Sequence, residues 1–475
     1  MKYKVLIGLE MHCEMKSNRK VFSPSKNEYN EEPNVCVSPV DLALPGTLPV
    51  VNIECVKKAL KMAQALGCST PEYFYFERKN YYYPDLPKGY QITQETKPIP
   101  AGIYGNFSYL CNGEVKTVRI NNIHLEEDSA NLTHEDNRSL INYNRCGVPL
   151  LELVTEPDMH SSDEAVAFLE SMRRIYRYLD ISEADTKKGQ IRCDVNVSIM
   201  EEDSDTLGTR VEIKNVNSFG GVKNAIEYEI KRQIEMKENG TYSTLEQETR
   251  RWDEDSMTTI FMRDKKNAID YKYFVDPNIP KFKVEKSLLD SIKSTIPELP
   301  LSRYNRYIDL GISSKYAETI IQDKEISDYF DKCLDLGINP NTLSNWLITN
   351  ILGYLNQTEE SIKDLFITPL YLKEIIDELE SGNISSKIAK DIFNKSIKEK
   401  KEPKLYFEDS KQISNEDELI SIIDNILANN EDNITAYKNG KSNLFQFFVG
   451  QVMKETKGKA NPELVRDILD RKLNN

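Results

Sequence analysis

The sequence predicts an α+β domain followed by two helical domains, and three observations support this fold class. Up to about residue 280, several segments alternate apolar and polar side chains with the two-residue period of a strand. Beyond Lys293, apolar residues recur at the three- and four-residue spacing of helices. The charged run KSIKEKKEPK then interrupts this helical pattern. We therefore expect an α+β domain with an antiparallel sheet over residues 1–293, a helical domain over 294–405 and a small helical tail over 406–475.

The composition is that of a globular protein with no membrane anchor. The 475 residues are too many for one hydrophobic core, and 39% of them are hydrophobic against 29% charged. No apolar run could span a bilayer, and the N-terminus enters a charged strand without a signal peptide, so we expect a cytoplasmic protein. The net charge of −14 is not that of a nonspecific nucleic-acid coat. The segment from Gly440 to the end, however, has seven basic and four acidic residues, so a polyanion could dock there.

The first predicted strand, Val5 to Lys16, carries the most distinctive side chains. Glu10, His12 and Glu14 alternate with apolar residues and share one face of the strand. Two carboxylates beside an imidazole can hold a hard cation or relay a proton. A half-solvated strand with a polar outer face shows the same pattern, and for this strand alone it is the simpler explanation.

The next segments are a predicted helix and an aromatic loop. The helix covers Glu54 to Leu66 and ends at Gly67. The loop FERKNYYYPDLPKGYQITQ contains Lys79, Tyr82 and Lys88. Such a loop can stack a base and hold phosphate, or it can simply pack on a sheet edge. Spacing alone does not choose between these alternatives.

Four further strands repeat the pattern of the first. One begins at Val118 and ends in Glu126, and another places Glu152 between two leucines, where a buried carboxylate needs a partner or a metal. A helix capped by Ser161 and Ser162 follows. The strands near Ile191–Ile199 and Arg210–Lys214 then present Asp194 and Glu212, and a helix spans Asn224 to Glu238.

Convergence of these strands would create a carboxylate cluster. Its members would be Glu10, His12, Glu126, Glu152, Asp194 and Glu212. Mutual repulsion forbids leaving all the carboxylates ionised without cations, and oxygen-rich clusters with few soft ligands suit Mg²⁺. Because the pattern recurs in five strands, a metal site explains it as well as ordinary amphipathic strands do.

Several motifs are absent. The sequence NGKS at 439–442 resembles the end of a phosphate loop, but Thr435 occupies the place of the required first glycine. There is no GxGxxG and no GxSxG. Any ATP chemistry must run without a P-loop, and any hydrolytic release of ammonia needs another chain. The eight cysteines form no CxxC pair, so we expect small buried side chains and no zinc site.

Motifs from the first strand to the tail resemble one family. They are IGLEMHCEM, YYYPDLPKGYQITQ, HLEEDSANLTH, NRCGVPLLELVTEPD, IRCDVNVSI, GTRVEIKNVNSF and FFVGQVMKETKGKANP. Together they are similar to the B subunits of aspartyl/glutamyl-tRNA amidotransferases. The chain departs from the family in two places. Cys36 is not followed by a second cysteine of a CxxC, which argues against zinc, and Val275 stands where proline is usual.

The resemblance implies a cradle-like catalytic domain that holds Mg²⁺ and ATP, a helical domain and a mobile tRNA-binding tail. It implies a heterotrimer with a glutaminase A subunit and a small C subunit. The complex would phosphorylate the side-chain carboxylate of Glu-tRNA(Gln) or Asp-tRNA(Asn) with ATP, then amidate it with ammonia from the A subunit. This ATP-dependent ligase would use glutamine as its amide donor.

The resemblance also implies residue roles. The metal and catalytic roles carry over to Glu10, His12, Glu126, Glu152, Asp194 and Glu212. Substrate or nucleotide contacts carry over to Lys79, Tyr82, Lys88, Arg210 and Lys214. In the basic tail, Lys454, Lys457 and Lys459 are expected to bind tRNA.

Two other functional classes stay open. The chain could be a noncatalytic tRNA-binding scaffold that positions an active partner. The carboxylates alone would also suit a metal-dependent nuclease or phosphatase.

Overall fold

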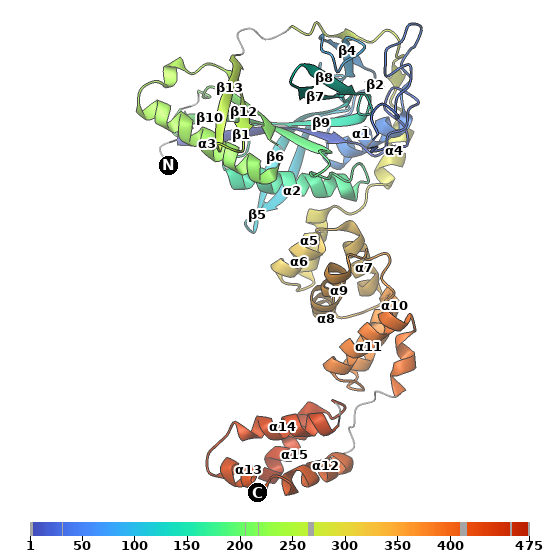
Figure 1. Ribbon diagram of the computed structural model, residues 1–475, viewed down its shortest axis with the longest axis vertical. Coiled ribbons are helices and arrows are strands. Elements are labelled where there is room, and N and C mark those ends of the chain that lie inside the picture. Colours follow the sequence, from blue (N-terminus) through green and yellow to red (C-terminus); the bar gives the residue numbers. More distant parts are fainter. Residues whose placement is uncertain are drawn as a thin grey trace. The chain divides into compact units, whose positions relative to one another are not determined.

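A computed structural model gives the fold in two compact units, Met1–Arg303 and Tyr304–Asn475. It describes residues 3–30, 32–204, 206–216, 218–264, 270–408, 416–456 and 458–473. The first unit mixes a large sheet with helices and the second is helical, which confirms the predicted fold class (Figure 1). The three-domain division stays a prediction.

An eight-stranded sheet organises the first unit, in the order β13-β12-β11-β10-β1-β9-β6-β5. Strand β1 lies inside it, between β10 and β9. Neighbouring strands are antiparallel as predicted, except that β11 and β12 are parallel. Helix α3 connects these two strands, and parallel neighbours need such a crossover. The strands are β1 (Tyr3–Glu14), β5 (Gly102–Cys111), β6 (Glu114–Glu127), β9 (Pro149–Thr155), β10 (Ile191–Glu201), β11 (Val211–Val216), β12 (Glu248–Asp253) and β13 (Thr258–Asp264).

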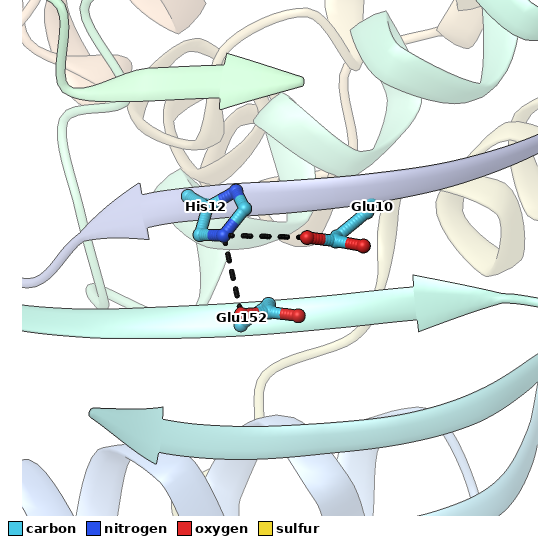
Figure 2. Close-up of side chains that lie close together, drawn as sticks. All are labelled: Glu10, His12 and Glu152. Atoms are coloured by element: carbon cyan, nitrogen blue, oxygen red, sulfur yellow. Dashed lines mark ion pairs between the residues drawn. The ribbon is translucent and has the colours of Figure 1, made fainter. Parts of the chain in front are cut away.

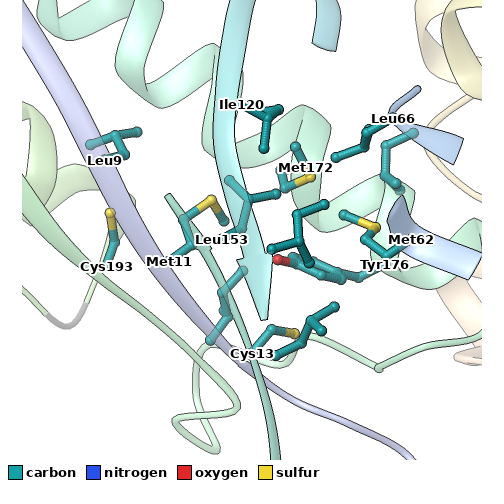
Figure 3. Packing of buried hydrophobic residues seen from close by; sticks show 14 of the residues in the cluster. Leu9, Met11, Cys13, Met62, Leu66, Ile120, Leu153, Met172, Tyr176 and Cys193 are labelled. Carbon is teal, nitrogen blue, oxygen red and sulfur yellow. The ribbon is translucent and has the colours of Figure 1, made fainter. Parts of the chain in front are cut away.

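Helices cover the apolar face of this sheet. They are α1 (Ile53–Ala65), α2 (Ser162–Tyr178) and α3 (Phe219–Glu238), with a 3-10 turn η1 (Tyr242–Thr244) after α3. Helix α4 (Lys286–Ser294) packs against α1. Ser161 caps α2 by accepting a hydrogen bond from the Glu164 N–H. In Figure 3, Met11 of β1 and Leu153 of β9 lie near Met172 of α2 in the core. This packing fixes the register, because a slip of one residue would turn each strand's apolar face outward.

The described part of the first unit also contains three small sheets. One orders β14 (Phe274–Val275), β3 (Glu77–Asn80) and β4 (Tyr90–Thr93). The others pair β15 (Phe282–Lys283) with β2 (Tyr73–Phe74), and β7 (Asn131–Glu135) with β8 (Arg138–Asn142). All eight cysteines of the chain are buried and unpaired, in keeping with the predicted role as small apolar side chains.

The second unit contains helices only, apart from its turns and loops, among the residues described. Its last helices share a core of their own that includes Leu419, Phe448 and Ile468. No helix in the described part of the chain is both long and apolar enough to cross a membrane. The first of these helices, α5, begins just before the boundary between the two units. The helices are α5 (Pro300–Asp309), α6 (Ser314–Ile320), α7 (Lys324–Asp335), α8 (Pro340–Trp346), the π-helix η2 (Leu347–Ile351), α9 (Leu352–Thr358), α10 (Pro369–Glu380), α11 (Ser386–Glu399), η3 (Pro403–Tyr406), α12 (Glu416–Ala428), α13 (Glu431–Lys438), α14 (Leu444–Glu455) and α15 (Pro462–Leu473).

Candidate active site

The polar face of β1 meets the polar faces of its two neighbours. Glu10 lies opposite Asp194 of β10, and His12 lies opposite Glu152 of β9. On its far side, Glu152 is also paired with His124 of β6. Side chains directly opposite on one face of a sheet are close enough to touch. The strand pairing therefore brings Glu10 to Asp194 and His12 to Glu152, although each of these two pairs is more than a hundred positions apart in the sequence.

Glu152 lies between two imidazoles. Its Oε2 atom is 3.1 Å from His12 Nε2 and 3.2 Å from His124 Nε2, and His12 Nε2 is also 3.8 Å from Glu10 Oε1. Figure 2 shows Glu10 and Glu152 approaching the same nitrogen of His12. The Nδ1 atom of His124 is 2.9 Å from Asn122 Oδ1, which fixes the orientation of that ring. Glu152 and His124 are buried, so their charges are poorly screened by water.

Burial and neighbouring charges shift the titration of this cluster. Burial disfavours the Glu152 carboxylate, but His124 and His12 hold its pKa well below the usual range. Burial also opposes charging of the two histidines, but Glu152 raises the pKa of each to about 9. Burial and the charge of Glu152 together raise the pKa of Glu10 and of Glu126 to about 7. The cluster therefore contains more carboxyl groups than its two histidines can neutralise, and Glu10 and Glu126 hold protons up to about pH 7.

Among the residues that the structure describes, two sets of side chains could each hold a metal ion. Glu10, His12 and Glu152 form one, and Glu95, His124 and Glu152 form the other, with donor atoms within 4.8 Å of one another in each set. Both sets share Glu152. The donors fit a divalent cation, because carboxylates outnumber imidazoles and a cation would relieve the repulsion that raises the pKa of Glu10.

The other predicted acids extend the same face. Glu126 is buried and accepts a hydrogen bond from Thr93 Oγ1 at 3.3 Å. On the opposite side of β1, Lys214 Nζ is 2.5 Å from Asp194 Oδ2 and 3.5 Å from Glu212 Oε1. Lys214 thus forms ion pairs with both carboxylates.

The predicted substrate-contacting residues fall into two groups. Burial opposes the charge of Lys79, but the negative charges of Glu126 and Glu152 raise its pKa, so this ammonium interacts electrostatically with the cluster. Lys88 forms an ion pair with Glu127, at the end of the strand that carries His124. Tyr82 is 92% exposed and Arg210 is exposed, and in the described part of the chain neither contacts the cluster.

The three predicted tRNA-binding lysines lie in the tail. Lys454 is exposed in the last turn of α14, and Lys459 is half-buried before α15. Lys457 lies outside the described residues.

Sequence reasoning missed His124 and Glu95 as site residues. His124 had a signal, because it shares a strand face with Glu126 in the same alternating segment. Glu95 follows β4 in a loop, and no pattern in the sequence marked it as a site residue. Only the fold brings its carboxylate to 3.9 Å from His124 Nε2.

Comparisons with known proteins show the family to which the chain belongs. The family model described as the GatB/GatE catalytic domain matches residues 5–290, and the GatB domain matches residues 328–473. The chain is 43% identical to a protein of Oceanobacillus iheyensis that is named as the B subunit of aspartyl/glutamyl-tRNA(Asn/Gln) amidotransferase, over 100% of both chains. Proteins with the same name from Persephonella marina and Thermoanaerobacter pseudethanolicus are 41% and 42% identical over 99% and 100% of both chains.

This chain belongs to the family of amidotransferase B subunits. The predicted resemblance is therefore confirmed. The first family match covers the unit that contains the eight-stranded sheet, including all the strands that carry the cluster.

Proposed function

We propose that the chain is the ATP- and Mg²⁺-dependent subunit of a tRNA-dependent amidotransferase. It would phosphorylate the side-chain carboxylate of Glu-tRNA(Gln), Asp-tRNA(Asn) or both. Ammonia released from glutamine by a glutaminase A subunit would then displace the phosphate, and a small C subunit would complete the complex. The names of the relatives, as B subunits of an amidotransferase, support a role in a multi-subunit complex.

The observation that carries this proposal is the meeting of Glu10, His12 and Glu152 on the adjacent strands β1 and β9. A carboxylate is a poor acceptor for ammonia because oxide is a poor leaving group. Converting it into an acyl phosphate provides a good one. That conversion gathers negative charge between nucleotide and substrate, so a site for it must hold cations.

Acidic and basic side chains would have different roles in this reaction. Bound Mg²⁺ would neutralise phosphate oxygens and orient them, with Glu10, His12, Glu126 and Glu152 as its candidate ligands. Lys79 and Lys214 remain protonated, because Glu126 and Asp194 respectively favour their charged forms. Their ammonium groups suit the binding of phosphate or substrate carboxylate beside the cluster. His124 holds Glu152 from the side opposite His12 and so orients that carboxylate.

The test is amidation by the complex with its partner subunits, with ammonium chloride in place of glutamine. Glu126→Gln keeps the shape of the side chain and removes its charge. We expect product formation to fall by roughly 10²- to 10³-fold, with tRNA binding unchanged. Glu114→Gln is the matched control on the same strand, because Glu114 is exposed and pairs only locally with Lys116.

Each result decides between the alternatives. Full activity of Glu126→Gln would show that this chain is a scaffold for a catalytic partner. Cleavage of tRNA by the chain in Mg²⁺ alone would favour a nuclease.

A further inference from the structure

A β-bulge interrupts strand β6 just before His124. The apolar residues of this strand alternate up to Ile120, but the next buried one is Ile123, three positions later. The pairing of β6 with β9 also shifts register between Ile120 and Asn122. One extra residue, Asn121, lets both isoleucines stay in the core. Asn121 and Asn122 are both half-buried, and their side chains are left outside the apolar face.

Four side chains form a hydrogen-bonded chain that starts at His124 and passes through this bulge. His124 Nδ1 is 2.9 Å from Asn122 Oδ1, and Asn122 Nδ2 donates to Asn121 Oδ1 at 3.1 Å. Asn121 Nδ2 donates in turn to Glu156 Oε1 at 2.5 Å. Glu156 directly follows β9, the strand that carries Glu152. The chain therefore links a histidine of the cluster to a carboxylate outside it.

The carboxylate of Glu156 sets the direction of every bond in this chain. An ionised carboxylate only accepts hydrogen bonds, so Asn121 must present its NH₂ group to Glu156. The carbonyl oxygen of Asn121 then faces Asn122, whose NH₂ group donates to it. The atom of Asn122 that faces the ring of His124 is therefore its carbonyl oxygen, which needs a proton on Nδ1.

The other ring nitrogen of His124 faces two carboxylates. Nε2 is 3.2 Å from Glu152 Oε2 and 3.9 Å from Glu95 Oε2. This nitrogen is buried, and within the described part of the chain it makes no hydrogen bond of good geometry. A buried polar atom in that situation calls for a further partner. A divalent cation held by His124, Glu152 and Glu95 would be such a partner.

We propose that Asn122, Asn121 and Glu156 form a positioning relay, which keeps a proton on Nδ1 of His124 and presents Nε2 to a divalent cation. A cation that binds at Nε2 replaces any proton on that atom, which leaves to solvent, while the Nδ1 proton stays in the bond to Asn122. The importance of the relay for catalysis rests on the proposed function, whereas its effect on cation binding does not.

The two asparagines could instead have a purely structural role in the bulge. In that case the direction of their hydrogen bonds would have no consequence for a cation. Variants that keep the size of a side chain and change only its acceptor or donor atoms therefore separate the two roles.

Binding of Mn²⁺ to the full chain tests the acceptor at Asn122. Electron paramagnetic resonance measures free Mn²⁺ directly. We expect Asn122→Leu to weaken binding about 10- to 100-fold, because the Nδ1 proton loses its acceptor. Asn122→Asp restores an acceptor and should return the affinity to within threefold. Asn106→Leu is the matched control, an exposed position on the neighbouring strand β5, and its affinity should stay within twofold of the unaltered chain.

Glu156→Gln tests the direction of the chain. Glutamine can donate a hydrogen bond, so the amides can reverse and Asn122 can turn its NH₂ group toward Nδ1, which places the proton on Nε2. We expect Mn²⁺ binding to weaken about tenfold, although two asparagines separate Glu156 from the ring. Asp158→Asn is the matched control, because it removes one charge two residues further along, where the carboxylate pairs with Arg119. Its affinity should stay within twofold.

Nitrogen-15 NMR of the Mg²⁺-loaded chain locates the proton directly. The chain has four histidines, and the signals of His124 are those lost in His124→Gln. The unaltered chain should show a proton on Nδ1 of this ring and none on Nε2. A proton on Nε2, or equal Mn²⁺ affinities of Asn122→Leu and Asn106→Leu, would overturn the proposal. The NMR result comes from the unaltered chain and so decides the matter even if a variant does not fold.

Kinetics of the complex with its partner subunits connect the relay to the proposed function. Asn122→Leu should raise the Mg²⁺ concentration for half-maximal amidation about 10- to 100-fold and leave KM for misacylated tRNA within twofold. A higher KM for tRNA with unchanged Mg²⁺ dependence would assign Asn122 to the substrate and reject the relay. If the unaltered complex makes no amidated product, the proposed function fails, while the Mn²⁺ and NMR experiments still decide the relay.

Discussion

Replacing Glu152 with glutamine removes the charge shared by two imidazoles. The carboxylate lies 3.1 Å from His12 and 3.2 Å from His124, and it raises the pKa of both from 6.5 to about 9. Glutamine keeps the size of the side chain but offers no charge. We expect the pKa of both histidines in Glu152→Gln to fall from about 9 toward 6.5, because Glu152 is the largest of the negative charges that oppose the effect of burial.

The size of the effect on stability follows from these pKa values. A histidine whose pKa is raised on folding stabilises the folded chain fully below its unfolded pKa, and this stabilisation is lost as the pH rises through the folded pKa. With values of 6.5 and about 9, each imidazole contributes about 2.5 kcal/mol at pH 7 and less than about 0.5 kcal/mol at pH 9.5. Because both histidines share one carboxylate, we expect about 3–5 kcal/mol for the pair rather than a simple sum.

The assay is urea unfolding of the metal-free chain, with EDTA, at pH 7 and pH 9.5. The free energy of unfolding of Glu152→Gln should be lower by about 3–5 kcal/mol at pH 7, and the deficit should largely disappear at pH 9.5. Histidine NMR titration provides a second readout, since the chain has only four histidines.

Glu229→Gln is the matched control. Glu229 is fully buried and its Oε1 atom lies 2.8 Å from Arg232, a partner that stays charged at both pH values. Its loss should destabilise the chain equally at pH 7 and pH 9.5. A deficit of Glu152→Gln that is also equal at the two pH values, with unchanged histidine titration, would refute the assignment of these charges.

Three further outcomes are expected. Half-buried Glu10 and buried Glu126 hold protons up to about pH 7, so Mg²⁺ must displace protons below that pH. MgCl₂ should therefore raise Tm in calorimetry more at pH 8 than at pH 6, and equal increases would contradict the site. Gly147→Ala should cost about 1–3 kcal/mol in urea unfolding, because φ is +82° and the new Cβ would lie 2.9 Å from Asp41 Oδ1. Gly67→Ala, at φ +66° in open space, should cost less, and equal costs would mean that the contact with Asp41 is irrelevant. Lys454→Ala/Lys459→Ala should weaken tRNA binding and lower its salt dependence by a slope of about 1.8; an unchanged slope would remove these lysines from the tRNA contact.

The alternation of polar and apolar residues determined which face of each strand carries the candidate site residues. In β1, residues 9, 11 and 13 had to be buried, because any other register would expose three apolar side chains. Glu10 and His12 then had to share the opposite face. The same logic applied to Asp194 in β10 and Glu152 in β9.

Only the tertiary structure decided which of these faces touch. The alternating pattern is the same for any order of strands, so it could not tell that β9 lies beside β1 and places Glu152 between His12 and His124. Nor could it bring Glu95 from a loop to the same cluster, or set β11 parallel to β12, since both depend on chain crossings that have no local signal. Local periodicity is a property of neighbouring residues, whereas strand order follows from how the whole chain buries its apolar faces.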